Sequence, residues 1–114
     1  MFVKVIFCAL LLAIGNTCFA FTSADQFLHR LETASDGFDR VYIQGVGNGF
    51  MWANINLKVT GQKRQYCQIE SISLNSDNYI DIVKKTIAKN PTERNDPIEM
   101  VLLSGLIDTF PCKK

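Results

Sequence analysis

CQIESISLNSDNYIDIVKKTIAKNPTERNDPIEMVLLSGLIDTFPC, from Cys67 to Cys112, is the stretch that decides the fold of this chain. Two helical patterns lie between its two cysteines. A disulfide between Cys67 and Cys112 would close a loop of about 45 residues, worth on the order of 4 kcal/mol in the chain-entropy model. The stretch therefore predicts a helical C-terminal half that one covalent bond can hold together.

The first helical pattern starts at Asn75 or Ser76, either of which can cap a helix. It ends before Pro91, because a proline disfavours helical geometry in the residue that precedes it. Between these limits one apolar stripe recurs at three- and four-residue spacing, formed by Tyr79, Ile80, Val83 and Ile87.

The second helical pattern follows Asp96-Pro97-Ile98-Glu99, in which Asp96 is the expected N-cap and Pro97 the first helical residue. Apolar residues then surround most of the helix up to Phe110. This distribution fits a buried core helix, or one that also faces a partner subunit.

A short polar connection, Asn90 to Asp96, joins the two patterns. It lies between prolines and inside the cysteine loop, so we expect it to be rigid. Most such connections only join helices. A rigid, charge-bearing loop on a small scaffold is also what a plug for the cleft of another protein requires.

The N-terminus has the pattern of a signal peptide. Lys4 precedes a continuous apolar run, Val5 to Ile14, and Cys18-Phe19-Ala20 offers small residues for cleavage after Ala20. The run is too short for an ordinary transmembrane helix. We therefore expect residues 1–20 to be removed on export, leaving 21–114 as one domain in the periplasm with no membrane association.

Cleavage changes the charge and the cysteine count. Without Lys4, eleven basic residues balance eleven acidic ones, and a neutral domain lacks the field of a nucleic-acid binder. Loss of Cys8 and Cys18 leaves Cys67 and Cys112, an even pair that predicts a disulfide in an exported protein. Two buried thiols are the competing interpretation, and with a distant His29 the pair falls short of a metal-ligand set.

Two further helices are candidates in the N-terminal half. Ser23 with Gln26 forms a capping-box pattern ahead of an apolar face that ends at the turn residues 35–37. Phe38 to Val59 is ambiguous, since its apolar residues fit a helix while Gly45, Gly47 and Gly49 disfavour one. Asn48-Gly49 is also a hairpin signal, so local rules favour helix and hairpin about equally.

No sequence motif points to catalysis. The chain contains no His-Glu-x-x-His, no Gly-x-Ser-x-Gly and no cysteine–histidine pair with a supporting carboxylate. We therefore expect neither an enzyme nor a bound cofactor.

A set of residues and short motifs gives this chain a pattern that resembles that of the type VI secretion amidase immunity proteins, also called the resistance-associated-protein family. They are Tyr42-x-x-Gly45, Cys67, Ile82-Val83, Asn90-Pro91, Pro97 and Phe110-Pro111-Cys112. The resemblance covers about residues 38–112. It implies an all-α bundle of about four to five helices with one intramolecular disulfide, and it favours the helix for Phe38 to Val59.

The resemblance also implies a function. Such proteins are periplasmic, often homodimeric, and block a peptidoglycan-cleaving amidase that neighbouring bacteria deliver. They act by occlusion, with a helix and an adjoining loop entering the active-site groove. Mapped here, the effector-binding candidates are Lys89, Asn90, Thr92, Glu93, Arg94 and Asn95, with exposed residues of the preceding helix. The alternative from another class is a periplasmic helical stress chaperone that binds unfolded clients.

Overall fold

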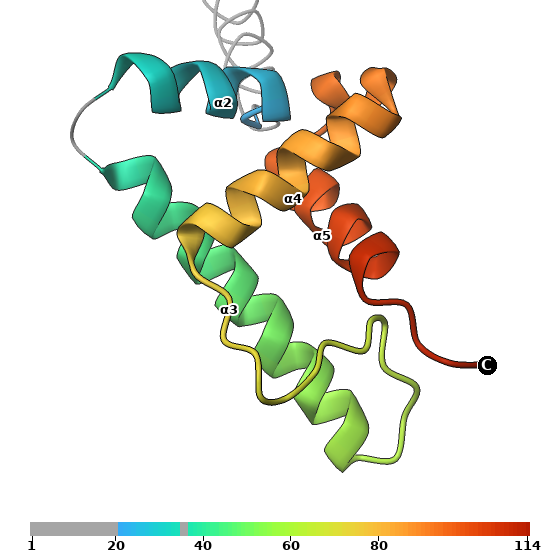
Figure 1. The fold of residues 1–114 in the computed structure, drawn as a ribbon. Coiled ribbons are helices and arrows are strands. Elements are labelled where there is room, and N and C mark those ends of the chain that lie inside the picture. Colours follow the sequence, from blue (N-terminus) through green and yellow to red (C-terminus); the bar gives the residue numbers. More distant parts are fainter. Residues whose placement is uncertain (1–20, 35–36) are drawn as a thin grey trace, which may run out of the picture.

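The computed structural model describes residues 21–34 and 37–114, and within them the fold is all-helical (Figure 1). Its elements are α2 (Ala24–Thr33), α3 (Phe38–Val59), α4 (Ser76–Lys89), the 3-10 helix η1 (Pro91–Asn95) and α5 (Ile98–Thr109). The predicted all-α class is confirmed. The predicted signal peptide and its cleavage after Ala20 lie outside the described residues, as do positions 35 and 36 of the predicted turn.

The N-cap of α2 forms as predicted, and of the two candidates for α4 the cap is Asn75. Ser23 and Gln26 satisfy each other's backbone N–H groups in a capping box at the start of α2. Asn75 caps α4 and makes the same reciprocal pair with Asn78. Both caps join residues that are three positions apart in the chain. Caps of this kind can therefore be predicted from the sequence alone.

The predicted cap of α5 is wrong. Pro97 is not the first helical residue, because its ψ of 136° is extended and α5 begins at Ile98. The backbone around Pro97 pairs instead with Ser23 in an isolated antiparallel bridge. Pro97 takes the N-cap position predicted for Asp96, and no side chain caps α5. The carbonyl of Asp96 accepts a hydrogen bond from the N–H of Ala24, so Asp96 joins this segment to the start of α2.

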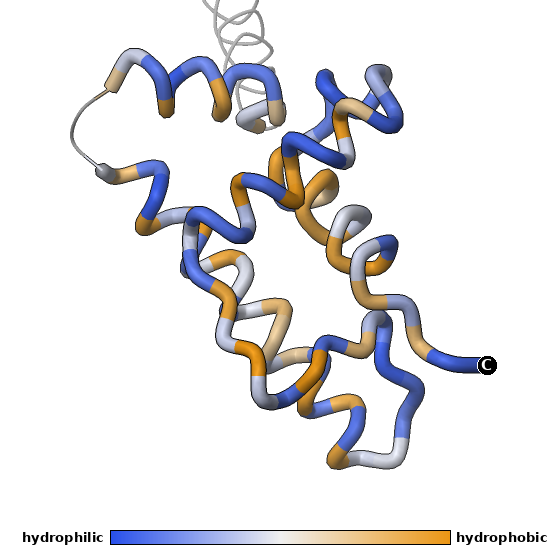
Figure 2. Tube along the Cα trace, viewed as in Figure 1, coloured by the Kyte–Doolittle hydropathy of each residue, from blue (hydrophilic) through white to orange (hydrophobic). Residues whose placement is uncertain are grey.

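The stretch from Phe38 to Val59 is one continuous helix, as the resemblance implies. Gly47 is buried in it, while Gly45 and Gly49 are exposed. Beyond the crossing with α4, the C-terminal half of α3 extends away from the α4–α5 pair (Figure 1), and hydrophobic positions continue along it (Figure 2).

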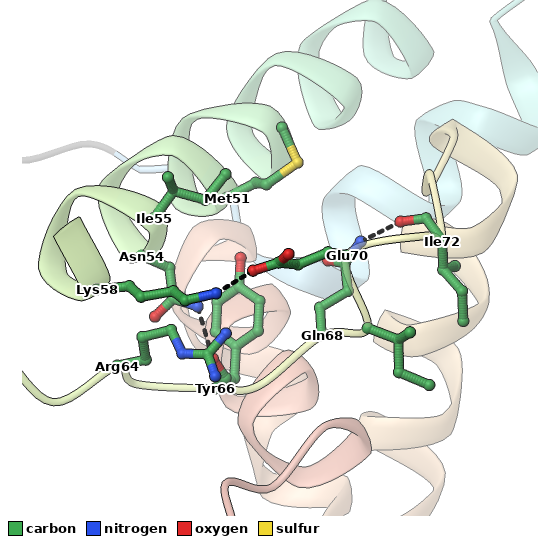
Figure 3. Close-up of a pocket in the computed structure, with 10 residues that line it drawn as sticks. Met51, Asn54, Ile55, Lys58, Arg64, Tyr66, Gln68, Glu70 and Ile72 are labelled. Atoms are coloured by element: carbon green, nitrogen blue, oxygen red, sulfur yellow. Dashed lines mark hydrogen bonds and ion pairs between the residues drawn. The ribbon is translucent and has the colours of Figure 1, made fainter.

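A long irregular segment, residues 60–75, returns from the end of α3 to α4. Asn54 of α3 fixes its path. Its side-chain amide donates to the Tyr66 carbonyl at 2.6 Å (Figure 3), and its side-chain oxygen accepts from the Gln65 N–H at 2.8 Å. The predicted Cys67–Cys112 disulfide is formed and joins this segment to the residues after α5. Beside it, the Cys67 N–H donates to the Phe110 carbonyl at 2.7 Å.

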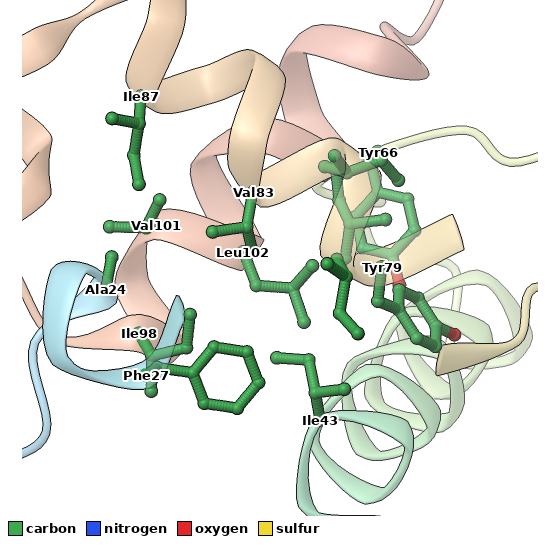
Figure 4. Close-up of a cluster of buried hydrophobic side chains, with 13 residues drawn as sticks. Ala24, Phe27, Ile43, Tyr66, Tyr79, Val83, Ile87, Ile98, Val101 and Leu102 are labelled. Carbon is green, nitrogen blue, oxygen red and sulfur yellow. The ribbon is translucent and has the colours of Figure 1, made fainter. Parts of the chain in front are cut away.

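The core lies where α2, the first half of α3, α4 and α5 meet (Figure 4). Phe27 of α2, Ile43 of α3, Val83 of α4 and Leu102 of α5 are all fully buried. The apolar stripe predicted for α4 is buried here against α5. Tyr66 and Tyr79 extend this cluster toward the segment 60–75.

Candidate binding surface

The six predicted effector-binding residues lie together at the turn between α4 and α5. Lys89 is the last residue of α4, Asn90 follows it, and the other four belong to η1, which occupies one end of the molecule (Figure 1). Sequence reasoning expected a loop here, whereas the structure has a short 3-10 helix. We call residues 89–95 the η1 turn.

Two backbone connections hold the C-terminal side of the η1 turn. The Ala24 N–H donates to the Asp96 carbonyl at 3.0 Å, and the Ile98 N–H donates to the Thr22 carbonyl at 3.0 Å. The contacts that hold the turn are therefore not those expected from the sequence. The disulfide follows the opposite end of α5, and it is the segment before α2 that anchors the turn.

Within the turn, Asn90 and Glu93 face inward and stabilise it. The Glu93 N–H donates to the Asn90 carbonyl at 3.0 Å, and the Asn90 side-chain amide donates to Glu93 Oε1 at 3.3 Å. Both residues are half-buried. Their side chains are thus engaged in the fold, which makes them weaker candidates for direct contact with a partner.

The charged side chains at the two ends of the turn form surface ion pairs. Lys89 Nζ lies 3.3 Å from Asp108 Oδ2, and Arg94 Nη1 lies 3.8 Å from Asp25 Oδ1. All four side chains are about half-exposed or more. Exposed pairs of this kind contribute only about 0–1 kcal/mol, so either cation can be redirected to a partner at small cost.

Thr92, Arg94 and Asn95 form the outward face of the turn. Next to them lies a shallow depression of about 280 Å³, lined by Asp25, Leu28, His29, Glu32, Ile87 and Arg94. Sequence reasoning missed the contribution of α2 to this surface. Asp25, His29 and Glu32 are exposed and Leu28 belongs to the apolar face of α2, but only the tertiary packing places these residues beside η1.

A second concave surface lies between the C-terminal half of α3 and residues 64–72 (Figure 3). Its volume is about 100 Å³, and Met51, Ile55, Ile69 and Ile72 supply apolar walls. Lys58 and Glu70 form an ion pair at its mouth, and the hydrogen bond from Lys58 lowers the pKa of Glu70.

One polar atom inside this groove lacks a hydrogen bond. The Gln68 amide donates to the Ile72 carbonyl at 2.7 Å, while its Oε1 is buried without a partner. A buried acceptor of this kind is uncommon in native structures. The groove is too small to hold a large ligand, and its ionisable groups form a surface pair rather than an acid–base arrangement.

A polar cluster ties the start of α3 to its neighbours. Arg30 donates to both carboxylate oxygens of Asp39, at 2.8 and 3.2 Å, and also lies 3.5 Å from the Thr22 hydroxyl. Tyr42 donates to Glu99 of α5, and this hydrogen bond raises the pKa of Tyr42. These hydrogen bonds join side chains of different helices, and the Arg30–Asp39 pair is bidentate. The cluster therefore positions α2 and α3.

Across residues 21–34 and 37–114, no group of three His, Cys, Asp or Glu side chains is arranged to hold a metal ion. No helix in the same ranges is both long and apolar enough to cross a bilayer. Comparison of the chain with protein-family models, curated proteins and solved structures finds no match.

Proposed function

We propose that this chain is a periplasmic immunity protein that binds a peptidoglycan amidase and occludes its active site. The proposal starts from the resemblance of residues 38–112 to the amidase immunity family. Its main structural support is the η1 turn, a rigid, charged projection at one end of a helical bundle. Rigidity favours this role because a preorganised turn loses little conformational entropy when it binds.

The proposed mechanism needs no chemistry from this chain. The outward face of the turn enters the substrate groove of the amidase and excludes the peptide. Arg94 leaves its weak pair with Asp25 and binds a carboxylate or carbonyl at the groove, while Asn95 supplies amide hydrogen bonds. Such polar contacts mainly increase specificity and the association rate.

The test is binding between the purified chain and the amidase encoded beside its gene. We expect a stoichiometric complex in which peptidoglycan cleavage is abolished. Arg94→Ala combined with Asn95→Ala should weaken binding about tenfold or more, because it removes a cation and an amide from the centre of the contact. Gln62→Ala combined with Lys63→Ala is the matched control, since it removes the same two groups from an exposed turn elsewhere.

Two results would contradict the proposal at different levels. Absence of a complex at micromolar concentrations would exclude the amidase as the partner. If both double variants formed the complex equally well, the chain would still be an inhibitor, but the η1 turn would not be the part that enters the active site. Isothermal titration calorimetry measures binding, and the release of soluble peptide from purified cell wall measures inhibition of cleavage.

A periplasmic stress chaperone is the second candidate function. One observation favours it: large apolar side chains, including Val41, Trp52 and Val59, are exposed along α3. Exposed apolar surface is what a chaperone offers to unfolded clients. Suppression of the aggregation of unrelated proteins at low pH, without any complex with the amidase, would support this candidate and exclude the first.

A further inference from the structure

The charges of residues 21–114 are unevenly distributed, although acidic and basic side chains are equal in number. Residues 50–73 and 109–114 carry a single acidic side chain, Glu70, and five basic ones, Lys58, Lys63, Arg64, Lys113 and Lys114. Residues 21–49 and 74–108 carry six basic and ten acidic side chains. A net charge of zero therefore hides one basic and one acidic part of the chain, each with a field of its own.

The tertiary structure brings the five basic side chains to one end of the molecule. Lys58 and Arg64 line the same groove, between the C-terminal half of α3 and residues 64–72 (Figure 3), and Lys63 directly precedes Arg64. The Sγ atom of Cys112 lies 3.8 Å from the Arg64 carbonyl oxygen, so the two lysines that follow Cys112 start from the same place. We call these five cations the basic end.

Most of this charge is free to meet an external anion. Within residues 21–34 and 37–114, Lys58 is the one member of the basic end that has an ion pair, and its exposed pair with Glu70 contributes little to stability. The other three lysines are exposed. Their long side chains can therefore turn toward a binding surface without breaking a contact of the fold.

Exposed apolar side chains lie among these cations. Ile55 and Ile69 line the same groove as Lys58 and are 38% and 60% exposed. Trp52 and Val59 lie three positions before and four positions after Ile55, so they share its side of α3, and they are 64% and 78% exposed. An ordinary solvated charged face does not gather large apolar side chains in this way.

The shape of this end suits a broad surface rather than a small ligand. The C-terminal half of α3 extends away from the α4–α5 pair (Figure 1), and hydrophobic positions continue along it (Figure 2). The groove beside it holds about 100 Å³, which is too little to enclose a large ligand. The apolar and basic side chains are thus carried on a projection.

An anionic lipid bilayer offers what such a projection requires. Its phosphates attract lysine and arginine, and its hydrocarbon begins just beneath them, where apolar side chains are buried. Tryptophan favours this interface, and lysine can bury its aliphatic stem while its ammonium stays at the phosphates. The cations come from three separate segments, and mobile headgroups can rearrange to meet them, whereas a protein partner needs acidic groups in matching fixed positions.

We propose that the basic end, with Trp52 and Val59 among its cations, binds the surface of an anionic phospholipid bilayer. The contact is peripheral, so it revises the expectation of no membrane association without requiring a spanning helix. It is independent of the amidase proposal. The η1 turn occupies the other end of the molecule (Figure 1) and stays open to a partner.

Vesicle binding by the full chain, expressed for export and with its disulfide intact, tests this proposal. Binding to phosphatidylcholine vesicles that contain about 30% phosphatidylglycerol should be at least about tenfold stronger than binding to phosphatidylcholine alone. It should weaken at least about tenfold between about 50 and 500 mM salt, because salt screens exposed charges. Trp52 is the only tryptophan of the chain, and its fluorescence should move to shorter wavelength as it leaves water.

A pair of charge variants locates the contact. Lys63→Gln combined with Lys113→Gln removes two cations of the basic end and should weaken vesicle binding about tenfold. Lys84→Gln combined with Lys85→Gln is the matched control, because it removes the same net charge from exposed positions on α4 and should weaken binding less than twofold. All four positions are exposed, so circular dichroism should show the same fold in both variants.

A pair of apolar variants separates insertion from attraction between charges. Val59→Ser should weaken binding about fivefold, because the valine no longer leaves water. Val41→Ser is the matched control, since Val41 is 74% exposed and lies about 27 Å away along α3. If both variants weakened binding equally, the contact would run along the whole of α3 and the end-on arrangement would be wrong.

Three further results would overturn the proposal. The first is an absence of binding to the anionic vesicles at low salt. The second is binding that the two double lysine variants weaken equally, with no change in Trp52 fluorescence, because this would indicate attraction by net charge alone. The third is binding to soluble poly-L-glutamate that is tighter than binding to vesicles of equal anion concentration, because this would indicate an acidic polypeptide as the partner.

Discussion

Gly47 of α3 lies directly against the phenol ring of Tyr79 of α4. A Cβ built on Gly47 would stand 2.6 Å from Cε1 of that ring and closer still to two of its other carbons. Tyr79 is 1% exposed, so the ring has no free space into which it can move. The missing side chain at residue 47 is therefore what lets α3 and α4 pack together at this point.

Gly47→Ala should destabilise the protein, although alanine is the better helix former. Overpacking a filled core costs about 1–3 kcal/mol, and we expect a net loss of about 2 kcal/mol in the free energy of unfolding. Gly45→Ala is the matched control, because its Cβ meets open space and it should gain up to about 1 kcal/mol. Urea unfolding in dilute solution measures both, and a stabilised Gly47→Ala variant would contradict the packing argument.

This contact explains why α3 is a helix despite its glycines, and why local rules could not decide between helix and hairpin. Each glycine lowers helix propensity, yet Gly47 is required by a residue more than 30 positions away. Such a requirement has no local signature. The cap at Ser23 is predicted correctly, and the cap at Asn75 is one of two predicted candidates, because both depend on residues three positions apart. Asp96 and Pro97 are misassigned because their partners are at positions 22–24.

The candidate site was predictable to a similar extent. The residues of the η1 turn lie together because they are consecutive, so their clustering required no tertiary information. Their ion pairs could not be predicted without the tertiary structure. Asp25 and Asp108, which pair with Arg94 and Lys89, come from other helices. The depression beside the turn likewise depends on how α2 packs.

Loss of the Cys67–Cys112 disulfide should lower stability more than any single surface change. The bond closes a sequence separation of 45 residues, and removal of such a bond from a small domain typically costs about 2–5 kcal/mol. The variant with both cysteines replaced by alanine should show this loss in urea unfolding. Reductant should lower the free energy of unfolding of the wild type to the level of the variant and leave the variant unchanged. A difference below about 1 kcal/mol between the oxidised wild type and the variant would show that the bond is dispensable.

Asn54 should be the most sensitive polar residue of α3. It is 7% exposed, and its amide satisfies the Tyr66 carbonyl and the Gln65 N–H at once. Asn54→Ala leaves both backbone groups without that partner and should cost about 2–3 kcal/mol. Asn56→Ala, an exposed change half a turn along the same helix, should stay within about 0.5 kcal/mol.

Hydrogen exchange gives an independent reading of the Asn54 variants. The amide of Gln65 should lose protection in Asn54→Ala but not in Asn56→Ala. Equal stability and equal protection in the two variants would show that the path of residues 60–75 is set elsewhere, by the disulfide alone.

Alkaline pH should destabilise the fold through Tyr66. Burial raises the pKa of Tyr66 to about 12, and the nearby Tyr79 adds to the shift. In the unfolded chain the phenol has its ordinary pKa of about 10, so the unfolded state loses the proton first as the pH rises. The contribution of Tyr66 is therefore fully present below about pH 10 and is lost progressively between about pH 10 and 12.

Tyr66→Phe keeps the ring in the core and removes the ionisation. Thermal unfolding between pH 8 and 12 should fall less steeply for this variant than for the wild type, with brief exposure to alkali to preserve the disulfide. A residual slope is expected because burial also raises the pKa of Tyr79. Identical slopes in the two proteins, or phenolate absorbance that accounts for all three tyrosines near pH 10 in the folded state, would show that Tyr66 is accessible to solvent.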